Sequence, residues 1–187
     1  LIGGMERFAK DFYRYMCRLA DVTLIANPKG KRNVPIFFIK VLLYLVFNAH
    51  KFDLIHFNDA ILAPAIPVIR IFSKAKITFT VHGLDIVYNK FGYQVLVIPF
   101  LRSADHVFPV SRYTKEQCLQ RNIPSEKLTI IPNGLDFSAP LPCNTDIQQS
   151  IEVLSKTTIQ GKFVLLTLGR LIPRKGHAWF VKNVFTQ

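Results

Sequence analysis

The sequence predicts an α/β protein built around a mostly parallel β-sheet. Short apolar segments rich in β-branched residues alternate along the chain with segments of helical length. Parallel strands need a crossover connection of about that length, so the alternation indicates βαβ units. Half of the residues are hydrophobic, which is enough for a substantial core and argues against disorder.

The first half of the chain opens with a helical pattern, because Phe8, Phe12 and Met16 recur at the spacing of one helix face. Strands are predicted where short apolar runs are bounded by polar or turn residues. The expected order is a helix at 6–19, a strand at 21–27, a basic loop at 28–35, an apolar segment at 36–47, a strand at 53–59, a proline-interrupted helix at 61–74 and a strand at 76–85.

The second half continues this alternation and then loses it. We expect a helix at 94–102, a strand at 106–111, a helix at 113–122 and a strand at 127–136 that ends in an Asn-Gly turn. From 137 to 161 the periodicity breaks down, apart from a helical stretch at 147–156, and a buried strand is predicted again at 163–168. We therefore expect a Rossmann-like first domain at 1–138, a linker and start of a second domain at 139–161, and a truncated second domain at 162–187.

The charge balance indicates an anionic partner. Lys and Arg number 24 against 12 Asp and Glu, which gives a formal net charge of +12. Nucleotides, nucleic acid and acidic lipid surfaces all suit such an excess. No zinc finger, helix-turn-helix or aromatic–basic pattern accompanies it, so nucleic-acid binding is not expected. The three cysteines are scattered, as in proteins of a reducing cytosol, and the five histidines form no metal-binding pattern.

The apolar segment at 36–47 follows a basic loop and contains Lys40. It is too short to span a bilayer, which takes about 20 apolar residues. Two alternatives stay open: a buried helix of the fold, or a helix that lies in the headgroup region of an anionic membrane.

Cations follow the predicted strand at 163–168. Arg170 comes almost directly after it, and Lys175 precedes a helix-like pattern. Ligands of open α/β sheets bind at the carboxyl ends of the strands, beside helix N-termini, so this pattern predicts a phosphate-bearing ligand. Gly3 and Gly4 precede the first helix and would let a ligand approach free N–H groups, although a glycine pair is more often a structural turn. Glu6 in the first turn is favoured by the helix dipole alone.

Polar residues also end two neighbouring predicted strands. They are His56, Asn58 and Asp59 after one strand, and His82, Gly83 and Asp85 after the next. The carboxyl ends of adjacent parallel strands meet in one cleft, where a histidine serves as hydrogen-bond donor or general base. The alternative that each histidine is a satisfied structural residue stays open, more so for His56. A metal held by His56 and Asp59 would lack further ligands, so none is expected.

Asn133 and Gly134 end the last predicted strand of the first domain. Both residue types tolerate φ > 0, so a structural turn is the favoured interpretation. A position at the mouth of a cleft is the functional alternative.

Six motifs follow one another along the chain in a familiar order. They are GGMER at 3–7, DLIHFND at 53–59, TVHGLD at 80–85, VS at 110–111, IIPNGLD at 130–136 and GRLIPRKG at 169–176. In this order they resemble the family 4 glycosyltransferases, enzymes of the GT-B architecture with two Rossmann-like domains facing a cleft.

The resemblance implies transfer of a sugar from a nucleotide-sugar donor to a glycan or lipid-linked acceptor, with retention of configuration and without a metal or other cofactor. Arg170 and Lys175 would hold the donor diphosphate, helped by backbone amides at Gly3 and Gly4. His82 would lie near the reacting sugar. The acceptor would face Glu6 together with His56, Asn58 and Asp59, while Gly83, Asp85, Asn133 and Gly134 would shape the cleft or its turns.

The resemblance also bears on the extent and location of the protein. We interpret the chain as a fragment that would transfer no sugar alone, from a cytoplasmic protein that contacts the membrane peripherally. The alternative function is a non-catalytic nucleotide-sugar-binding or membrane-docking protein derived from the same fold. A basic nucleic-acid-binding domain is the third and weakest hypothesis.

Overall fold

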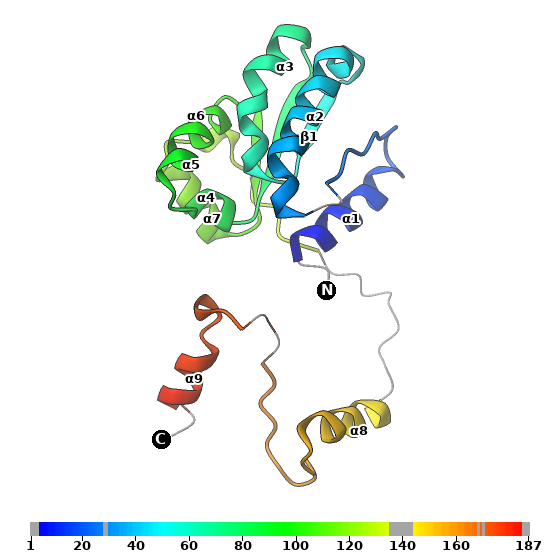
Figure 1. The fold of residues 1–187 in the computed structure, drawn as a ribbon, viewed down its shortest axis with the longest axis vertical. Coiled ribbons are helices and arrows are strands. Elements are labelled where there is room, and N and C mark those ends of the chain that lie inside the picture. Colours follow the sequence, from blue (N-terminus) through cyan, green and yellow to red (C-terminus); the bar gives the residue numbers. More distant parts are fainter. Residues whose placement is uncertain (1–3, 28–29, 135–143, 168, 170, 185–187) are drawn as a thin grey trace. The chain divides into compact units, whose positions relative to one another are not determined.

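The computed structural model describes residues 4–27, 30–134, 144–167, 169 and 171–184. The chain divides into two units, Leu1–Leu135 and Asp136–Gln187, which are described separately (Figure 1). The predicted domain limits, with a linker at 139–161, stay a prediction.

Unit 1 alternates strands with helices, as its sequence predicts. In chain order its elements, with η for a 3-10 helix, are α1 (Gly4–Met16), η1 (Lys31–Asn33), α2 (Val34–Asn48), η2 (Ala49–Lys51), β1 (Leu54–Phe57), η3 (Ala60–Ala65), α3 (Ile66–Phe72), β2 (Lys76–Val81), α4 (Leu84–Val87), α5 (Phe91–Leu96), α6 (Ile98–Leu101), β3 (His106–Pro109), α7 (Arg112–Leu119) and η4 (Ser125–Lys127). The three strands form one parallel sheet in the order β1-β2-β3. The predicted α/β class with a parallel sheet is confirmed.

The central strand β2 is hydrogen-bonded to a strand along each of its edges, and packed side chains cover both of its faces. Its residues Ile77, Phe79 and Val81 are fully buried and point to one face. That face forms the apolar core together with Val41 and Leu45 of α2 and with buried residues of α3 and α6. Thr78 and Thr80 point to the opposite face, where α1 packs through its aromatic residues.

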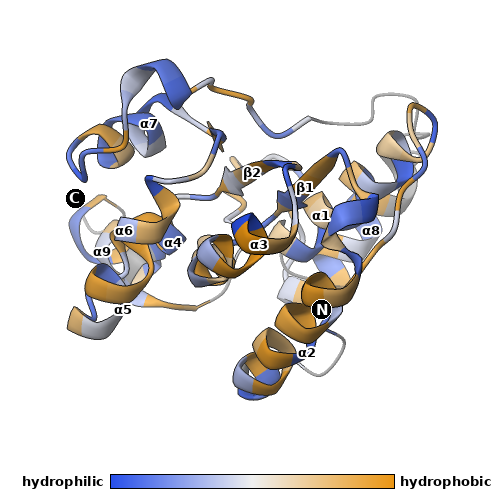
Figure 2. Ribbon diagram, turned by 90° about the horizontal axis from the view of Figure 1, so that it is seen from above, coloured by the Kyte–Doolittle hydropathy of each residue, from blue (hydrophilic) through white to orange (hydrophobic). Residues whose placement is uncertain are grey.

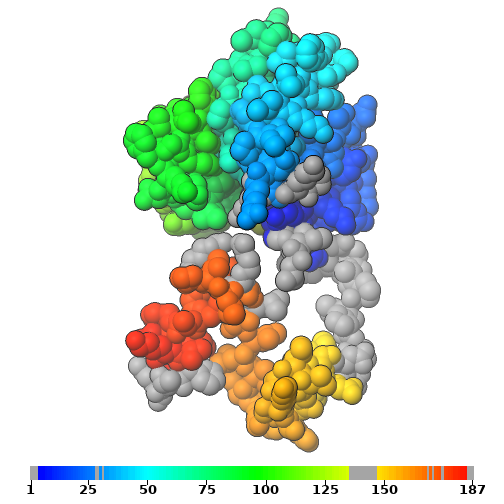
Figure 3. All heavy atoms as spheres, in the orientation of Figure 1, coloured from blue at the N-terminus to red at the C-terminus, as the bar shows by residue number. Residues whose placement is uncertain are grey.

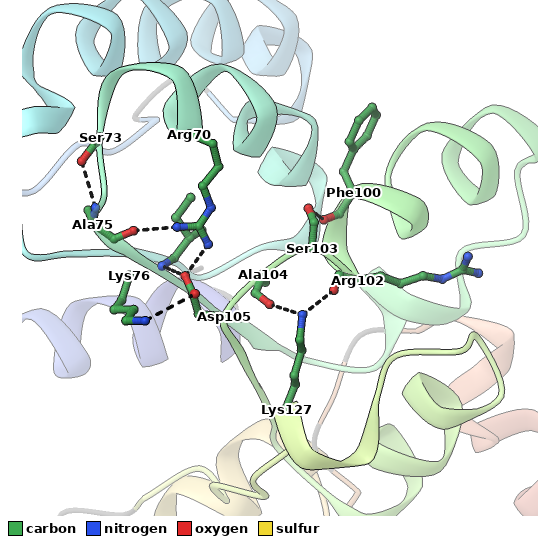
Figure 4. A network of polar contacts seen from close by, with 11 residues as sticks. Arg70, Ser73, Ala75, Lys76, Phe100, Arg102, Ser103, Ala104, Asp105 and Lys127 are labelled. Atoms are coloured by element: carbon green, nitrogen blue, oxygen red, sulfur yellow. Dashed lines mark hydrogen bonds and ion pairs between the residues drawn. The ribbon is translucent and has the colours of Figure 1, made fainter.

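A polar network closes the amino ends of β2 and β3 (Figure 4). The Asp105 carboxylate accepts hydrogen bonds from the Ile77 N–H, at 2.7 Å, and from the Arg70 guanidinium of α3. Asp105 also donates its own N–H to the Ile77 carbonyl. Lys127 donates to the carbonyls of Arg102 and Ala104, each at 2.9 Å. These hydrogen bonds connect β2, β3 and α3 at the amino end of the sheet.

One predicted strand of unit 1 does not form, and a second forms only in part. Residues 21–27 have no regular structure, and Leu24 is 54% exposed. A strand is stable only when its N–H and C=O groups pair with a neighbour, and the described residues provide none for this segment. The predicted strand at 127–136 pairs with β3 only in part: Leu128 forms a parallel bridge with Val107, and the N–H groups of Thr129 and Ile131 donate to the carbonyls of Val107 and Pro109.

Unit 2 contains α8 (Asn144–Ser155), η5 (Pro173–Lys175) and α9 (His177–Val184). The helix predicted at 147–156 is observed within α8. The strand predicted at 163–168 is not observed over its described residues, 163–167, and Phe163 is 91% exposed. Its apolar composition predicted burial, but the described part of unit 2 provides no strand to pair with it.

Candidate functional site

The carboxyl ends of β1 and β2 bring together most of the residues singled out in unit 1. His56 is in β1, and Asn58 and Asp59 follow that strand. His82 and Gly83 follow β2 and lead into α4, which contains Asp85. The parallel pairing of β1 with β2 places these two strand ends side by side.

His56 is held firmly by hydrogen bonds on both ring nitrogens. Nδ1 lies 2.8 Å from the Thr78 hydroxyl, and Nε2 lies 3.1 Å from the Thr80 hydroxyl and 3.2 Å from Asn58 Oδ1. The Phe12 ring of α1 packs over the imidazole, with ring centroids 4.8 Å apart. Burial lowers the pKa of His56 to about 4, although the bond to Asn58 opposes this shift. The imidazole is therefore neutral at physiological pH.

His82 is held by its backbone rather than by its ring. Its N–H donates to both carboxylate oxygens of Asp85, at 2.9 and 3.1 Å. The ring nitrogen Nε2 is buried and has no hydrogen-bond partner among the described residues. The Phe8 ring of α1 packs edge-on against the imidazole at 5.0 Å, and burial lowers the pKa of His82. A neutral imidazole with an unpartnered nitrogen can donate to, or accept from, a ligand oxygen.

Asp85 is a buried carboxyl group in the same corner of unit 1. Burial raises its pKa to about 6, the His82 N–H opposes that shift, and the charge of Asp59 adds to it. Asp59 itself accepts a hydrogen bond from the Ile61 N–H at 3.0 Å and caps η3. Burial and both carboxylates raise the pKa of Tyr93, whose buried hydroxyl has no partner among the described residues.

Gly83 makes the turn from β2 into α4 at φ +90°, a region that side-chain-bearing residues rarely adopt. A Cβ atom at this position would lie 3.3 Å from the Thr114 hydroxyl. Thr114 is buried in α7, where Ser111 caps the helix by accepting the Thr114 N–H. The glycine therefore permits both the turn and the close approach of α7.

The N-terminal half of α1 contacts this corner, because the Phe8 ring packs against His82. Gly4 and Glu6 are both exposed there, and Gly3 lies outside the described residues. A Cβ atom on Gly4 would meet nothing within 4 Å, so packing does not require glycine at this position. Asn133 and Gly134 are exposed in an irregular segment. The roles expected for these residues stay predictions.

The predicted phosphate site belongs to unit 2. Arg170 lies outside the described residues, whereas Lys175 ends η5 with an exposed side chain. Gly176 then adopts the left-handed conformation, φ +72°, and α9 begins at His177. A hollow of about 250 Å³ is lined by Thr167, Lys175, Gly176, His177, Phe180 and Val181. It joins a cation to the start of a helix, an arrangement suited to an anion.

Several residues of these sites were not predicted as site residues from the sequence. Phe8, Phe12, Thr78 and Thr80 surround the two histidines, and Tyr93 lies with the carboxylates. The alternation of side chains along a strand could have indicated the two threonines. Once β1 and β2 are paired in register, Thr78 and Thr80 lie on the same face of the sheet as His56. In unit 2, His177 has a buried Nε2 without a partner among the described residues.

No metal centre emerges from the part of the chain that the structure describes. It holds no group of three or more His, Cys, Asp or Glu residues suited to a metal ion. The expectation of a metal-free site stays a prediction.

Comparison with solved structures shows a shared fold. The chain is similar to HepE from Anabaena, crystallised with UDP and glucose, at 18% identity and a TM-score of 0.68 over 97% of this chain. A HepE structure with UDP-glucose gives 17% identity and a TM-score of 0.65 over 91% of this chain. The chain covers 54% of HepE in the first comparison and 46% in the second, so it spans about half of that protein. This likeness confirms the predicted GT-B type of fold.

Comparison with curated proteins gives no match. The family model of Glycosyltransferase Family 4, by contrast, matches residues 2–139. That range contains α1, the three strands and the corner around His82. The chain therefore belongs to glycosyltransferase family 4.

Proposed function

We propose that the full-length protein transfers a sugar from a nucleoside-diphosphate donor to a glycan or lipid-linked acceptor, with retention of anomeric configuration. One observation carries the proposal. Within a family 4 glycosyltransferase chain, His82 lies at the carboxyl end of β2 with a neutral ring and a buried Nε2 that has no partner in the part of the chain that the structure describes. Ligands of open α/β sheets bind at this end of the strands.

The donor class follows from the chemistry of both units and from a structural neighbour. HepE, which has the same fold, was crystallised with UDP and with UDP-glucose. A uridine diphosphate sugar is therefore the first donor to test. Lys175, beside the start of α9, supplies a cation of the kind that a diphosphate requires.

Each residue has a defined task in the proposed reaction. Lys175 and Arg170 stabilise the negative charge that develops on the leaving nucleoside diphosphate, the work that a metal ion does elsewhere. The amides at Gly3 and Gly4 donate to the phosphate or the sugar. His82 hydrogen-bonds the transferred sugar through Nε2. The Phe8 ring packs against this imidazole, and Nε2 is buried in this structure. Sugar binding therefore requires a movement of the groups that cover Nε2.

Asp85 is a positioning residue in this proposal. Its carboxylate holds the His82 N–H through two oxygens and so fixes the turn that directs the imidazole. Asn58 and Asp59 face the acceptor, while His56 supports Asn58 by a hydrogen bond.

The proposed location is the cytoplasm. Cys17 and Cys118 are free thiols, which suits a reducing compartment. An acceptor linked to lipid would bring the enzyme to the cytoplasmic face of a membrane.

The test is a screen of the full-length gene product against nucleotide-sugars, with released nucleotide as the readout. We expect turnover with one donor, lowered about 100-fold by Lys175→Ala through loss of charge stabilisation. Lys162→Ala, at an exposed lysine of the same unit, is the matched control. The anomeric configuration of the product, read by NMR, tests retention. Donor binding without turnover would instead support a non-catalytic binding protein.

A further inference from the structure

Helix α2 has two apolar faces, and unit 1 covers one of them. Val41 and Leu45 are 3% and 4% exposed and belong to the core. On the opposite side an apolar stripe, defined as Ile36, Ile39, Leu43 and Phe47, lies in the solvent, with exposed fractions between 57% and 70%. These four residues recur at the spacing of one helix face. Figure 2 shows α2 as hydrophobic along nearly its whole length, and Figure 3 shows its segment at the surface of unit 1.

The charges in the sequence segment that carries the stripe are all of one sign. Between Asp21 and Asp53 the sequence contains no carboxylate, but it contains the cations Lys29, Lys31, Arg32, Lys40 and Lys51. Arg32 lies just before α2, Lys51 lies just after it, and both are exposed. Lys40 is also exposed, one residue beyond Ile39 and three before Leu43, and so borders the stripe. An apolar stripe with a cationic rim supplied by its own segment fits a surface that is apolar below and anionic above.

We infer that the stripe of α2 docks this protein on an anionic lipid bilayer, with the helix lying in the plane of the headgroups. The apolar side chains enter the boundary between headgroups and acyl chains, and Lys40 reaches back to lipid phosphates. The inference concerns a surface separate from the His82 corner and does not depend on sugar transfer.

A transmembrane arrangement of this segment disagrees with the packing. Among the described residues, the helical stretch Val34–Lys51 is long and apolar enough to cross a membrane by length and composition. Its α-helical part, α2, has 15 residues. At 1.5 Å per residue it extends about 22 Å, against a hydrocarbon thickness of about 30 Å. A crossing would also pull Val41 and Leu45 out of the core and place Lys40 inside the bilayer.

A second copy of the chain suits the stripe less well than lipid does. A two-fold dimer through this face would pair the stripe with itself. Both cationic rims would then meet, with no carboxylate between Asp21 and Asp53 to neutralise them. Anionic headgroups remove that repulsion.

The test measures partition of the chain onto vesicles of phosphatidylcholine, with and without phosphatidylglycerol. We expect binding to the anionic vesicles that falls with added salt. I39Q/L43Q should lower partition about tenfold or more, because two apolar side chains no longer enter the bilayer. K40Q should lower it about fivefold through loss of one surface cation. The controls F91Q/L96Q and K90Q change exposed residues in and beside α5 and should leave partition unchanged.

A fluorescent reporter then checks the orientation of the helix. Trp179 is the only tryptophan, so W179F/L43W places a single reporter in the stripe. We expect a blue shift on anionic vesicles and full release of the protein by alkaline carbonate. Four results would each overturn the inference: no binding, equal binding to neutral vesicles, carbonate-resistant insertion, or a dimer in solution that I39Q/L43Q dissociates. Circular dichroism verifies that every variant is folded.

Discussion

Asp105 and Asp85 lie at opposite ends of the same parallel sheet, and their surroundings shift the two carboxyl pKa values in opposite directions. At the amino end, burial alone would raise the pKa of Asp105, but the Ile77 N–H, the Arg70 guanidinium and Lys76 together hold it below its ordinary value. At the carboxyl end, burial dominates and raises the pKa of Asp85 to about 6. No cation is among the groups that offset this shift.

The two ends of the sheet therefore differ in how completely their carboxyl groups are compensated. At the amino end the carboxylate has a matched cation, and its bonds link β2, β3 and α3. At the carboxyl end a poorly compensated carboxyl group lies next to a histidine whose Nε2 has no partner among the described residues. Groups left incompletely satisfied in this way are more typical of ligand sites than of supporting structure.

The largest expected effect concerns the pH dependence that Asp85 imposes. A folded-state pKa of about 6, above the ordinary aspartate value of 3.8, means that the folded protein keeps a proton that the unfolded chain has lost. Stability therefore falls as pH rises through this window. Asp85→Asn removes the group, so its stability relative to the wild type should rise by roughly 3 kcal/mol between about pH 4 and pH 7.

Urea unfolding of both proteins at a series of pH values measures this difference. His56, whose pKa is lowered, contributes the opposite slope, but it cancels because both proteins contain it. If the stability of Asp85→Asn and of the wild type changed with pH in the same way, the inference that burial raises the pKa of Asp85 would be wrong.

Asp105→Asn should come next, with a loss of roughly 2 kcal/mol at neutral pH, since a charged hydrogen bond across two strands and a helix is weakened. The depressed pKa means that this stabilisation is present above the ordinary carboxyl pKa and is lost as pH falls through the folded-state value. Lys76→Gln is the matched control. Its 3.9 Å ion pair is largely exposed, so a change within about 0.5 kcal/mol is expected. Equal losses in both variants would remove the special role of Asp105.

Gly83→Ala tests whether the turn at the carboxyl end is structural. The positive φ and the nearby Thr114 hydroxyl predict a loss of about 1 kcal/mol in thermal unfolding. Gly92→Ala, within α5 and with open space around its Cβ position, should be neutral or stabilising. A neutral Gly83→Ala would indicate that this turn adapts freely.

His82→Ala should have the smallest effect on stability, less than about 0.5 kcal/mol, because losing the contact with Phe8 is offset by removing an unsatisfied nitrogen. Sugar transfer by the full-length protein should nevertheless fall about 100-fold. The measurement pairs chemical denaturation with the released-nucleotide assay. A destabilised but fully active variant would show that His82 has a structural role, and the proposed difference between the amino and carboxyl ends of the sheet would then be wrong.

Much of the fold was predictable because strand and helix periodicity is local. The segments that became β1, β2, β3 and α7 were each expected within a few residues of their observed bounds. The strands expected at 21–27 and 163–168 did not form over their described residues because no strand pairs with them, whereas the segment at 127–136 pairs with β3 over only a few residues. An apolar run becomes a strand only when another strand pairs with it, and a partner is a property of distant sequence.

The position of the candidate site at the strand ends was predictable, but the hydrogen-bond partners of its histidines were not. Two histidines at equivalent strand ends look alike in sequence, yet His56 has three hydrogen-bonding neighbours, whereas Nε2 of His82 has none among the residues that the structure describes. The difference depends on Thr78 and Thr80, which meet His56 only through the register of β1 with β2.

The linear sequence is enough to predict the α/β class, the order of motifs that resembles family 4 glycosyltransferases, and the cationic excess. These depend on residue type and spacing along the chain. Three-dimensional contacts determine which histidine is held by its neighbours, the direction in which the pKa values of Asp85 and Asp105 are shifted, and the fact that α2 buries one apolar face while exposing the other. Those outcomes depend on desolvation and on contacts between residues far apart in sequence, and spacing along the chain does not encode either one directly.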